Sequence, residues 1–173
     1  LIGNHSGQLP IDAVCIAAAL IVDANPARFI RSMVEKWTQT LPFISELFAR
    51  CGQVVGVPEN CRKLLESEEA ILVFPEGARG ISKTFEHRYQ LTEFGHGFMR
   101  LALETHTPIV PIAVIGGEEQ YPSVYDVKPL AKLLGMPAFP LVPTMLVPLV
   151  GLLPAPTKYR LYFGDPLRFS GDA

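Results

Sequence analysis

The sequence predicts an α/β domain in which a largely parallel central sheet is flanked by helices. Apolar stretches of strand length alternate with stretches of helical periodicity along most of the chain, which is typical of βαβ units. Residues 70–74 are apolar at every position, as expected for a strand buried on both faces. With 173 residues the chain is long enough for a sizeable core, so we expect residues 1–173 to form a single domain.

Helices and strands alternate in the first half of the chain. Residues 13–22 are apolar and predict a buried helix, because ten residues are too few to cross a bilayer. Residues 27–38 carry apolar side chains at helical spacing and predict an amphipathic helix, which packs on the core or rests on a membrane. The other elements expected here are a strand end at 1–4, a short helix at 42–50, a strand at 53–57, a helix from 58 and the buried strand at 70–74.

The second half continues the alternation with a helix at 97–106 and strands at 109–115 and 158–163. Residues 140–156 are nearly all apolar but contain five prolines. Each proline removes a backbone donor, which disfavours a transmembrane helix. This segment predicts an extended apolar wall, with an irregular loop over the core as the alternative.

The composition narrows the function classes. A net charge of −2 without a basic cluster argues against nucleic acid as a partner, whereas 49% hydrophobic residues favour a lipid-handling surface. Three cysteines without C-x-x-C spacing predict thiols in a reducing compartment, with no zinc site and no disulfide framework. The chain begins with leucine and shows no signal peptide, so we expect a fragment that lacks an N-terminal segment of a longer protein.

The segment from Asn4 to Asp12 brings a histidine and a carboxylate to a turn that leads into a helix. If Pro10 lies in the first helical turn, Asp12 lies just inside the helix and His5 in the loop before it. A helix throughout would separate the two side chains by roughly 10 Å of rise, so the loop must fold back, and Gly7 gives it that freedom. A histidine oriented by an acidic partner can take a proton from a hydroxyl. The alternative is a capped helix start with an incidental histidine.

A second motif, Phe-Pro-Glu-Gly-Ala-Arg-Gly at residues 74–80, directly follows the buried strand. An arginine fork beside glycines that admit backbone N–H groups suits an anion or a polar head group. Lys83 and Arg88 add positive charge nearby. Taken alone, the loop is also compatible with a structural turn that carries a surface ion pair.

The two motifs, in this order and spacing, resemble the first and third blocks of the glycerolipid acyltransferase family, which includes the 1-acylglycerol-3-phosphate acyltransferases. Residues 107–116 resemble the fourth block, and residues 52–62 occupy the place of the second. The resemblance covers nearly the whole chain and implies a glycerol-3-phosphate acyltransferase-like fold. It also implies roles for individual residues: His5 as general base, Asp12 as its orienting partner, Glu76, Gly77 and Arg79 as ligands of the acceptor's phosphate or glycerol head, and Pro111 as the floor of the site. Backbone N–H groups near Gly7 are candidates for an oxyanion hole.

Two departures from the family pattern bear on the acceptor. Six residues separate His5 from Asp12, whereas the usual family spacing is four. The longer spacing, with residues 95–98 and 116–119, is more similar to the branch of the monoacylglycerol and diacylglycerol acyltransferases, although that branch often lacks the glutamate and arginine retained here. The arginine of the second block has no clear counterpart, and Arg62 is the nearest candidate.

The resemblance therefore implies an enzyme that moves a fatty acyl group from acyl-CoA or acyl carrier protein to a glycerolipid hydroxyl. The first expected acceptor is 1-acylglycerol-3-phosphate or a related lysophospholipid, and the alternative is a neutral monoacylglycerol or diacylglycerol. No metal or bound cofactor is implied. We expect the protein to associate with a membrane surface on its cytoplasmic face.

Three other function classes are compatible with parts of the sequence. Residues 77–84 approach a phosphate-binding P-loop, but Ser82 stands where the second glycine is required. A serine hydrolase or thioesterase would use Ser6, yet the G-x-S-x-G elbow is missing from the sequence. A non-catalytic lipid-binding module is the third, and it predicts that His5 is dispensable.

Overall fold

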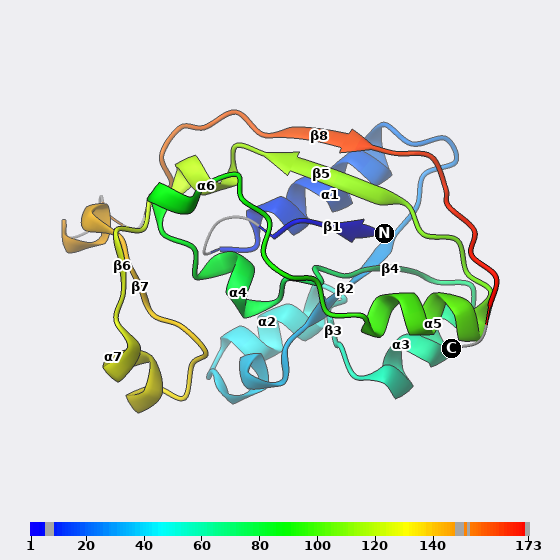
Figure 1. Cartoon of the computed structure of the whole chain (residues 1–173), viewed down its shortest axis with the longest axis horizontal. Helices are drawn as coiled ribbons and strands as arrows, with labels where there is room; N and C mark the ends of the chain where they lie inside the picture. The colour runs from blue at the N-terminus through cyan, green and yellow to red at the C-terminus, as the bar shows by residue number, and fades with distance from the viewer. Residues whose placement is uncertain (6–8, 148–150, 152, 172–173) are drawn as a thin grey trace.

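A computed structural model describes residues 1–5, 9–147, 151 and 153–171 of the chain (Figure 1). Strands β1 (Ile2–Gly3), β5 (Pro111–Ile115) and β8 (Arg160–Phe163) form one sheet in the order β1-β5-β8, with β1 parallel and β8 antiparallel to β5. A second sheet has the order β3-β2-β4 and is parallel throughout; it contains β2 (Ile30–Val34), β3 (Val54–Val55) and β4 (Ala70–Leu72).

The two sheets meet where β4 ends. Ile2 and Val73 form a parallel bridge, in which the Gly3 N–H donates to the Val73 carbonyl at 3.2 Å and the Val73 N–H donates to the Leu1 carbonyl at 3.0 Å. The predicted α/β class is confirmed. The predicted single, largely parallel central sheet is present only in part, because the described strands form small sheets, and β8 and the pair β6 (Tyr125–Asp126) and β7 (Pro140–Leu141) are antiparallel.

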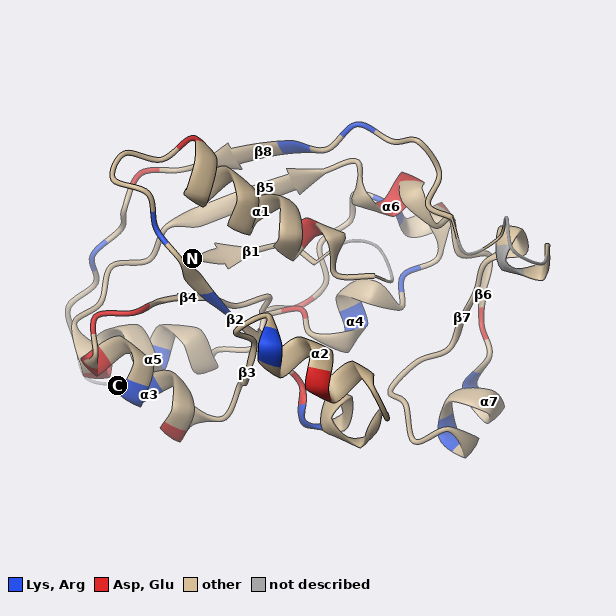
Figure 2. Cartoon of the chain, turned by 180° about the vertical axis from the view of Figure 1, so that it is seen from behind, with Lys and Arg blue, Asp and Glu red and all other residues tan. Residues whose placement is uncertain are grey.

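Helices cover both sides of the strands. Figure 2 shows α1 (Ile11–Val22) in front of the strands, whereas in Figure 1 α5 (Gly97–Thr105) lies in front. The remaining α-helices are α2 (Ile44–Arg50), α3 (Pro58–Glu66), α4 (Ala78–Ile81), α6 (Gly117–Gln120) and α7 (Lys128–Leu133). Three short 3₁₀ turns occur at η1 (Lys36–Thr40), η2 (Phe85–His87) and η3 (Pro143–Leu146).

Most of the predicted elements are confirmed, and one is wrong. Residues 27–38 form no α-helix; they contain strand β2 and the start of the 3₁₀ turn η1. The spacing of the apolar side chains fits a helix, but Ile30–Val34 lies between β3 and β4 and exchanges hydrogen bonds with both. All five residues are half-buried, so tertiary pairing overrides the local helical pattern.

The hydrophobic core sets the position of α1 relative to the strands. Ile16 and Leu72 are completely buried, and they cluster with Ala13, Ile112 and Val114 between α1 and the strands. The inward face of α1 is thereby held against β4 and β5, which places its first turn beside the end of β1.

Of the predicted apolar wall at 140–156, the described part forms β7 and η3, with Val142 completely buried and Leu146 and Leu153 exposed. Residues 148–150 and 152 lie outside the described residues.

Candidate active site

The end of β1 and the start of α1 bring His5 and Asp12 into contact. His5 Nδ1 lies 2.7 Å from Asp12 Oδ2, and the Asp12 side chain is fully buried. Asp12 Oδ1 accepts the Ala13 N–H at 2.8 Å, which fixes the carboxylate plane. The loop therefore folds back as the seven-residue offset requires. Residues 6–8, including the oxyanion candidate at Gly7, lie outside the described residues.

Two contacts hold the histidine in place. Asn4 exchanges two hydrogen bonds with the Val114 backbone of β5, donating Nδ2–H to the carbonyl at 2.9 Å and accepting the N–H at 2.7 Å. The His5 ring stacks on Phe74, with ring centroids 4.3 Å apart and planes inclined by 12°. Because Asp12 occupies Nδ1, Nε2 is the nitrogen left for a substrate, and the His5 side chain is 17% exposed.

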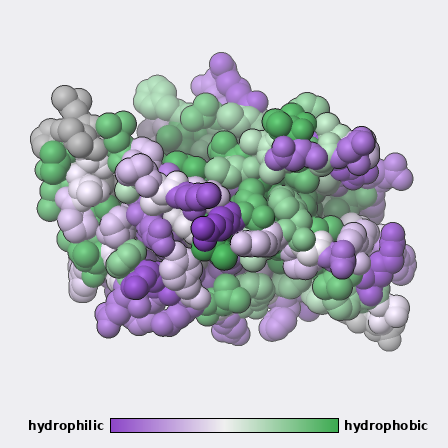
Figure 3. Space-filling model, turned by 90° about the horizontal axis from the view of Figure 1, so that it is seen from above, coloured by the Kyte–Doolittle hydropathy of each residue, from purple (hydrophilic) through white to green (hydrophobic). Residues whose placement is uncertain are grey.

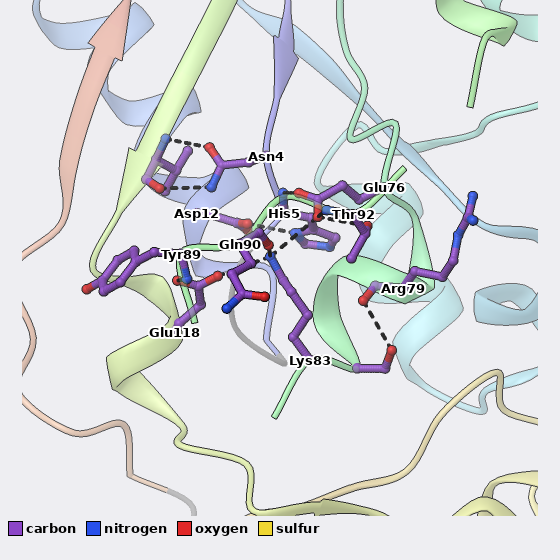
Figure 4. A network of polar contacts seen from close by, with 12 residues as sticks. Asn4, His5, Asp12, Glu76, Arg79, Lys83, Tyr89, Gln90, Thr92 and Glu118 are labelled. Carbon is purple, nitrogen blue, oxygen red and sulfur yellow. Dashed lines mark hydrogen bonds and ion pairs between the residues drawn. The ribbon is translucent and has the colours of Figure 1, made fainter. Parts of the chain in front are cut away.

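Glu76 lies directly behind the histidine and is 2% exposed (Figure 4). Its Oε1 accepts the His5 backbone N–H at 3.1 Å. Its Oε2 accepts the Thr92 N–H and hydroxyl, both at 2.9 Å, and lies 3.3 Å from Lys83 Nζ. Both carboxylate oxygens are thus engaged by the protein, which favours a positioning role for Glu76 over direct contact with an acceptor.

Gly77 makes the turn from the strand into α4. Its φ is +55°, and a Cβ there would lie 2.9 Å from Glu35 Oε1, which accepts the Ala78 N–H at 2.7 Å. The positive φ favours glycine at this position, and a Cβ there would also displace the Glu35 carboxylate.

The remaining predicted residues lie farther from the dyad. Arg79 is 60% exposed, extends away from the His5–Asp12 pair and meets Glu93 at 3.4 Å (Figure 4). Pro111 is exposed at the end of β5 that pairs with Ile2, and it is absent from the described lining of the cavity beside His5. Arg62 forms an ion pair of 2.6 Å with Glu104, which links α3 to α5.

A cavity of about 150 Å³ adjoins the His5 ring. It is lined by the first turn of α1, the end of β2, η1, α2 and α4, and its apolar lining includes Met33, Val34, Trp37, Phe48, Phe74 and Ile81. Glu35 is the one Asp, Glu, Lys or Arg among the described lining residues. The arrangement offers an oriented imidazole at the wall of an apolar chamber.

Neutral groups surround the Asp12 carboxylate. Burial, and then the Asp12 charge, raise the pKa of the Cys15 thiol. The same two causes, in the same order, raise the pKa of Tyr159 well above its ordinary value, and its hydroxyl donates to Gln120 Oε1 at 2.9 Å. Both groups therefore remain uncharged near neutral pH.

Four contributors to this arrangement were not predicted in their observed roles: Phe74, Lys83, Thr92 and Glu118. No helical spacing predicts the contact of Glu76 with Lys83, because Glu76 precedes α4 and Lys83 follows it. The stacking of Phe74 on His5 depends on β1 lying beside the end of β4, which the sequence does not state.

The described residues contain neither a cluster of metal ligands nor a membrane-spanning helix. No group of three or more His, Cys, Asp or Glu side chains among them could hold a metal ion. Within the same residues, no helix combines the length and apolar character needed to cross a membrane.

Sequence comparisons relate the chain to known proteins. The sequence model of a family described as acyltransferase matches residues 1–115. An uncharacterized protein of Mycobacterium tuberculosis is 43% identical over 172 residues, which cover 96% of this chain and 47% of that protein. An uncharacterized protein of Mycobacterium leprae is 41% identical over 172 residues, covering 96% of this chain and 46% of its own length.

A human protein named "DGAT1/2-independent enzyme synthesizing storage lipids" is 25% identical over 171 residues, covering 98% of this chain and 49% of that protein. The chain thus spans about half the length of the curated relatives it matches. No solved structure matches the chain significantly.

Proposed function

Because the chain belongs to the acyltransferase family, we propose that it transfers a fatty acyl group from a thioester donor, acyl-CoA or acyl carrier protein, to a hydroxyl of a glycerolipid. The observation that carries this proposal is the contact of 2.7 Å between His5 and the buried Asp12 at the wall of an apolar cavity. The pair supplies a base, and the cavity supplies an apolar surface for the part of a hydrocarbon chain next to the reacting group.

In the proposed reaction His5 Nε2 removes the proton of the acceptor hydroxyl while the oxygen attacks the thioester carbonyl. The C–O ester bond forms, the C–S bond breaks, and the imidazolium returns the proton to the departing thiolate. Asp12 holds the ring through Nδ1–H and stabilises the imidazolium. Proton transfer by a positioned side chain typically contributes about 10²- to 10⁴-fold in rate.

The cavity beside His5 suits an acyl chain. Trp37, Phe48 and Met33 offer hydrocarbon surface at its wall. Each methylene buried there contributes about 0.8 kcal/mol of binding free energy. Binding of the chain would fix the reacting carbonyl or hydroxyl near His5, which is itself a large part of the rate advantage of an enzyme.

Two observations favour a neutral glycerolipid, such as monoacylglycerol or diacylglycerol, as the acceptor. The described lining of the cavity contains the Glu35 carboxylate but no lysine or arginine, so it offers an anionic phosphate no counter-charge. The human relative at 25% identity is named for the synthesis of storage lipids.

A lysophospholipid, including 1-acylglycerol-3-phosphate, is the second candidate. It is favoured by Arg79, which is 60% exposed and whose contact with the 77% exposed Glu93 is long, at 3.4 Å. Such a surface ion pair is weak, so the guanidinium is available to a phosphate that approaches α4 from outside the cavity.

The test is to incubate the purified protein with labelled acyl-CoA and a panel of monoacylglycerol, diacylglycerol, lysophosphatidate and other lysophospholipids, and to identify products by mass. We expect acylated product with at least one glycerolipid, and most from the neutral acceptors. An Arg79→Gln variant should leave KM for a neutral acceptor unchanged, whereas a several-fold rise in KM for lysophosphatidate would favour the second candidate. Release of free fatty acid without any acylated lipid would contradict the proposal and indicate a thioesterase.

We further propose that the protein works at a membrane surface through the outer side of α1. Val14, Ala18, Ile21 and Val22 follow i, i+4, i+7, i+8 spacing and are exposed, and the preceding turn of the same helix lines the cavity through Ala13. Figure 3 shows apolar groups gathered across the side of the molecule that carries β8. The free cysteines at 15, 51 and 61 are consistent with the reducing cytoplasmic side.

Vesicle flotation tests this surface. Replacing Ile21 and Val22 by serine should reduce the fraction bound to phospholipid vesicles, because both apolar side chains are exposed, at 44% and 78%. A matched double replacement of the exposed Leu133 and Leu134 on the other end of the molecule serves as control. Equal flotation of the α1 variant and the unchanged protein would contradict this orientation.

A further inference from the structure

We propose that Lys83 is a positioning residue for the His5 base, an inference that rests on the proposed function because it takes His5 as the base. The Lys83 ammonium lies where α4 ends and is almost completely enclosed, with 7% of the side chain exposed. It contacts two carboxylates, Glu76 Oε2 at 3.3 Å and Glu118 Oε1 at 3.1 Å. It also donates to the Gln90 carbonyl at 3.0 Å.

The influence of Lys83 reaches the histidine through Glu76. One oxygen of that carboxylate contacts the ammonium, and the other accepts the His5 backbone N–H at 3.1 Å. Gly80 completes the connection, because a Cβ at this position would lie 3.0 Å from the Glu76 Cβ and 3.0 Å from the His5 carbonyl oxygen. Helix α4 is therefore packed directly on the backbone of the proposed base, Lys83 follows the end of this helix, and a shift of Glu76 moves His5.

The charges around Lys83 explain why an ammonium is needed there. Glu76 is fully buried at its side chain and Glu118 is 9% exposed, and both lie on the same nitrogen. Without the positive charge, two carboxylates would face each other in a region of low dielectric. Such a pair separates or takes up a proton. Either response changes the hydrogen bond from the His5 N–H to the Glu76 carboxylate.

The same ammonium ties a separate segment to the back of the site. Glu118 Oε2 accepts the Tyr89 N–H at 2.9 Å, Lys83 holds the Gln90 carbonyl, and Thr92 donates twice to Glu76. Figure 4 shows this network gathered beside the His5–Asp12 pair. Lys83 thus connects the end of α4, α6 and residues 89–92 into one rigid layer behind His5. This layer keeps the histidine loop in place when a substrate contacts the ring.

Steady-state kinetics of Lys83→Met test this role. We expect kcat to fall about 100-fold with KM for both substrates within twofold, because a displacement near 1 Å in the base costs about that factor. Lys83→Arg keeps the charge and donors, and it should recover kcat to within about tenfold of the unchanged protein. Lys132→Met, an exposed lysine on α7, is the matched control and should change nothing.

A double variant separates positioning from a general effect on the fold. If Lys83 acts through His5, adding Lys83→Met to His5→Ala should lower the residual rate less than twofold. Should Lys83→Met not fold, Glu118→Gln serves instead, because it removes one of the two carboxylates and keeps the Lys83–Glu76 pair; we expect a three- to tenfold loss of kcat at unchanged KM. An undiminished kcat in the folded variant, or a full 100-fold further loss in the His5→Ala background, would overturn the inference.

A readout that does not need activity keeps this inference distinct from the proposed function. The proton between His5 Nδ1 and Asp12 should give a low-field NMR signal that broadens in Lys83→Met and persists in Lys132→Met. If the unchanged protein transfers no acyl group while this signal depends on Lys83, the proposed function fails and the positioning role stands. If the unchanged protein transfers acyl groups, but the NMR signal and kcat are the same in Lys83→Met, the positioning role is wrong and the proposed function stands.

Discussion

Replacing Gly80 by alanine tests how tightly α4 sets the position of His5. In an ordinary helix the change is favourable by about 1 kcal/mol. Here the new Cβ would lie 3.0 Å from the Glu76 Cβ, 3.0 Å from the His5 carbonyl oxygen and 3.1 Å from the His5 Cβ. Two of these three contacts are to His5 itself, so the strain falls on the base.

The magnitude follows from these distances. Ordinary contacts between such atoms lie at about 3.5–4.0 Å, so the neighbours must move by a few tenths of an ångström. Overpacking of this kind costs about 1–3 kcal/mol, which the helix preference partly offsets, leaving a net stability loss of about 0–2 kcal/mol. The same displacement would disturb the His5–Asp12 contact of 2.7 Å. We therefore expect kcat to fall about three- to tenfold, because a misplacement of about 1 Å can cost 100-fold and the displacement here is smaller.

Gly97→Ala is the control, because a Cβ at the start of α5 would meet no atom within 4 Å. Both variants are compared by thermal unfolding and by the rate of acyl transfer at saturating substrate. Gly97→Ala should match the unchanged protein in rate. A Gly80→Ala rate within twofold of the unchanged protein would refute the claim that α4 holds the base in position.

Three further outcomes follow from the packing and the titratable groups. Leu72→Ala should lower the free energy of unfolding by about 2–5 kcal/mol in urea denaturation, because Leu72 is completely buried in the core cluster; a loss below 1 kcal/mol would contradict that placement. Gly116→Ala should prevent stable folding, since φ is +103° and the added Cβ would lie 2.3 Å from the Lys158 carbonyl oxygen; a soluble variant with an unchanged melting temperature would exclude this turn geometry. Burial raises the pKa of the Cys15 and Cys61 thiols, so their thiolate fractions are small at pH 8 and rise only at higher pH. In mass-spectrometric alkylation the exposed Cys51 should therefore react first, and preferential labelling of Cys15 would show that α1 is not packed as described.

The sequence predicted local elements better than their pairing. Residues 13–22 and 97–106 were expected as helices and lie in α1 and α5, because caps, prolines and apolar periodicity are local signals. Residues 27–38 carry the same periodicity but form β2 and η1, because their neighbours β3 and β4 supply hydrogen bonds that no local pattern encodes. The separation of the strands into small sheets likewise depends on strand pairing, which no local pattern encodes.

The site was predictable to the extent that its geometry is local. The sequence showed that His5 and Asp12 can meet only if the loop between them folds back. In the structure the two side chains are in contact. The burial of Glu76 and the placement of Pro111 away from the cavity depend on the stacking of β1, β4 and β5, which the sequence leaves open. The motif thus identified a loop that lies beside His5, while the partners of its side chains depend on packing.

The most direct test of the proposed chemistry is the rate at which a folded His5→Ala variant transfers an acyl group to the best glycerolipid acceptor. The variant keeps the cavity and loses only the imidazole. We predict a loss of at least about 100-fold in kcat, as expected when a positioned general base is removed. A rate within tenfold of the unchanged protein, with the same circular dichroism spectrum, would show that the His5–Asp12 pair is not the base.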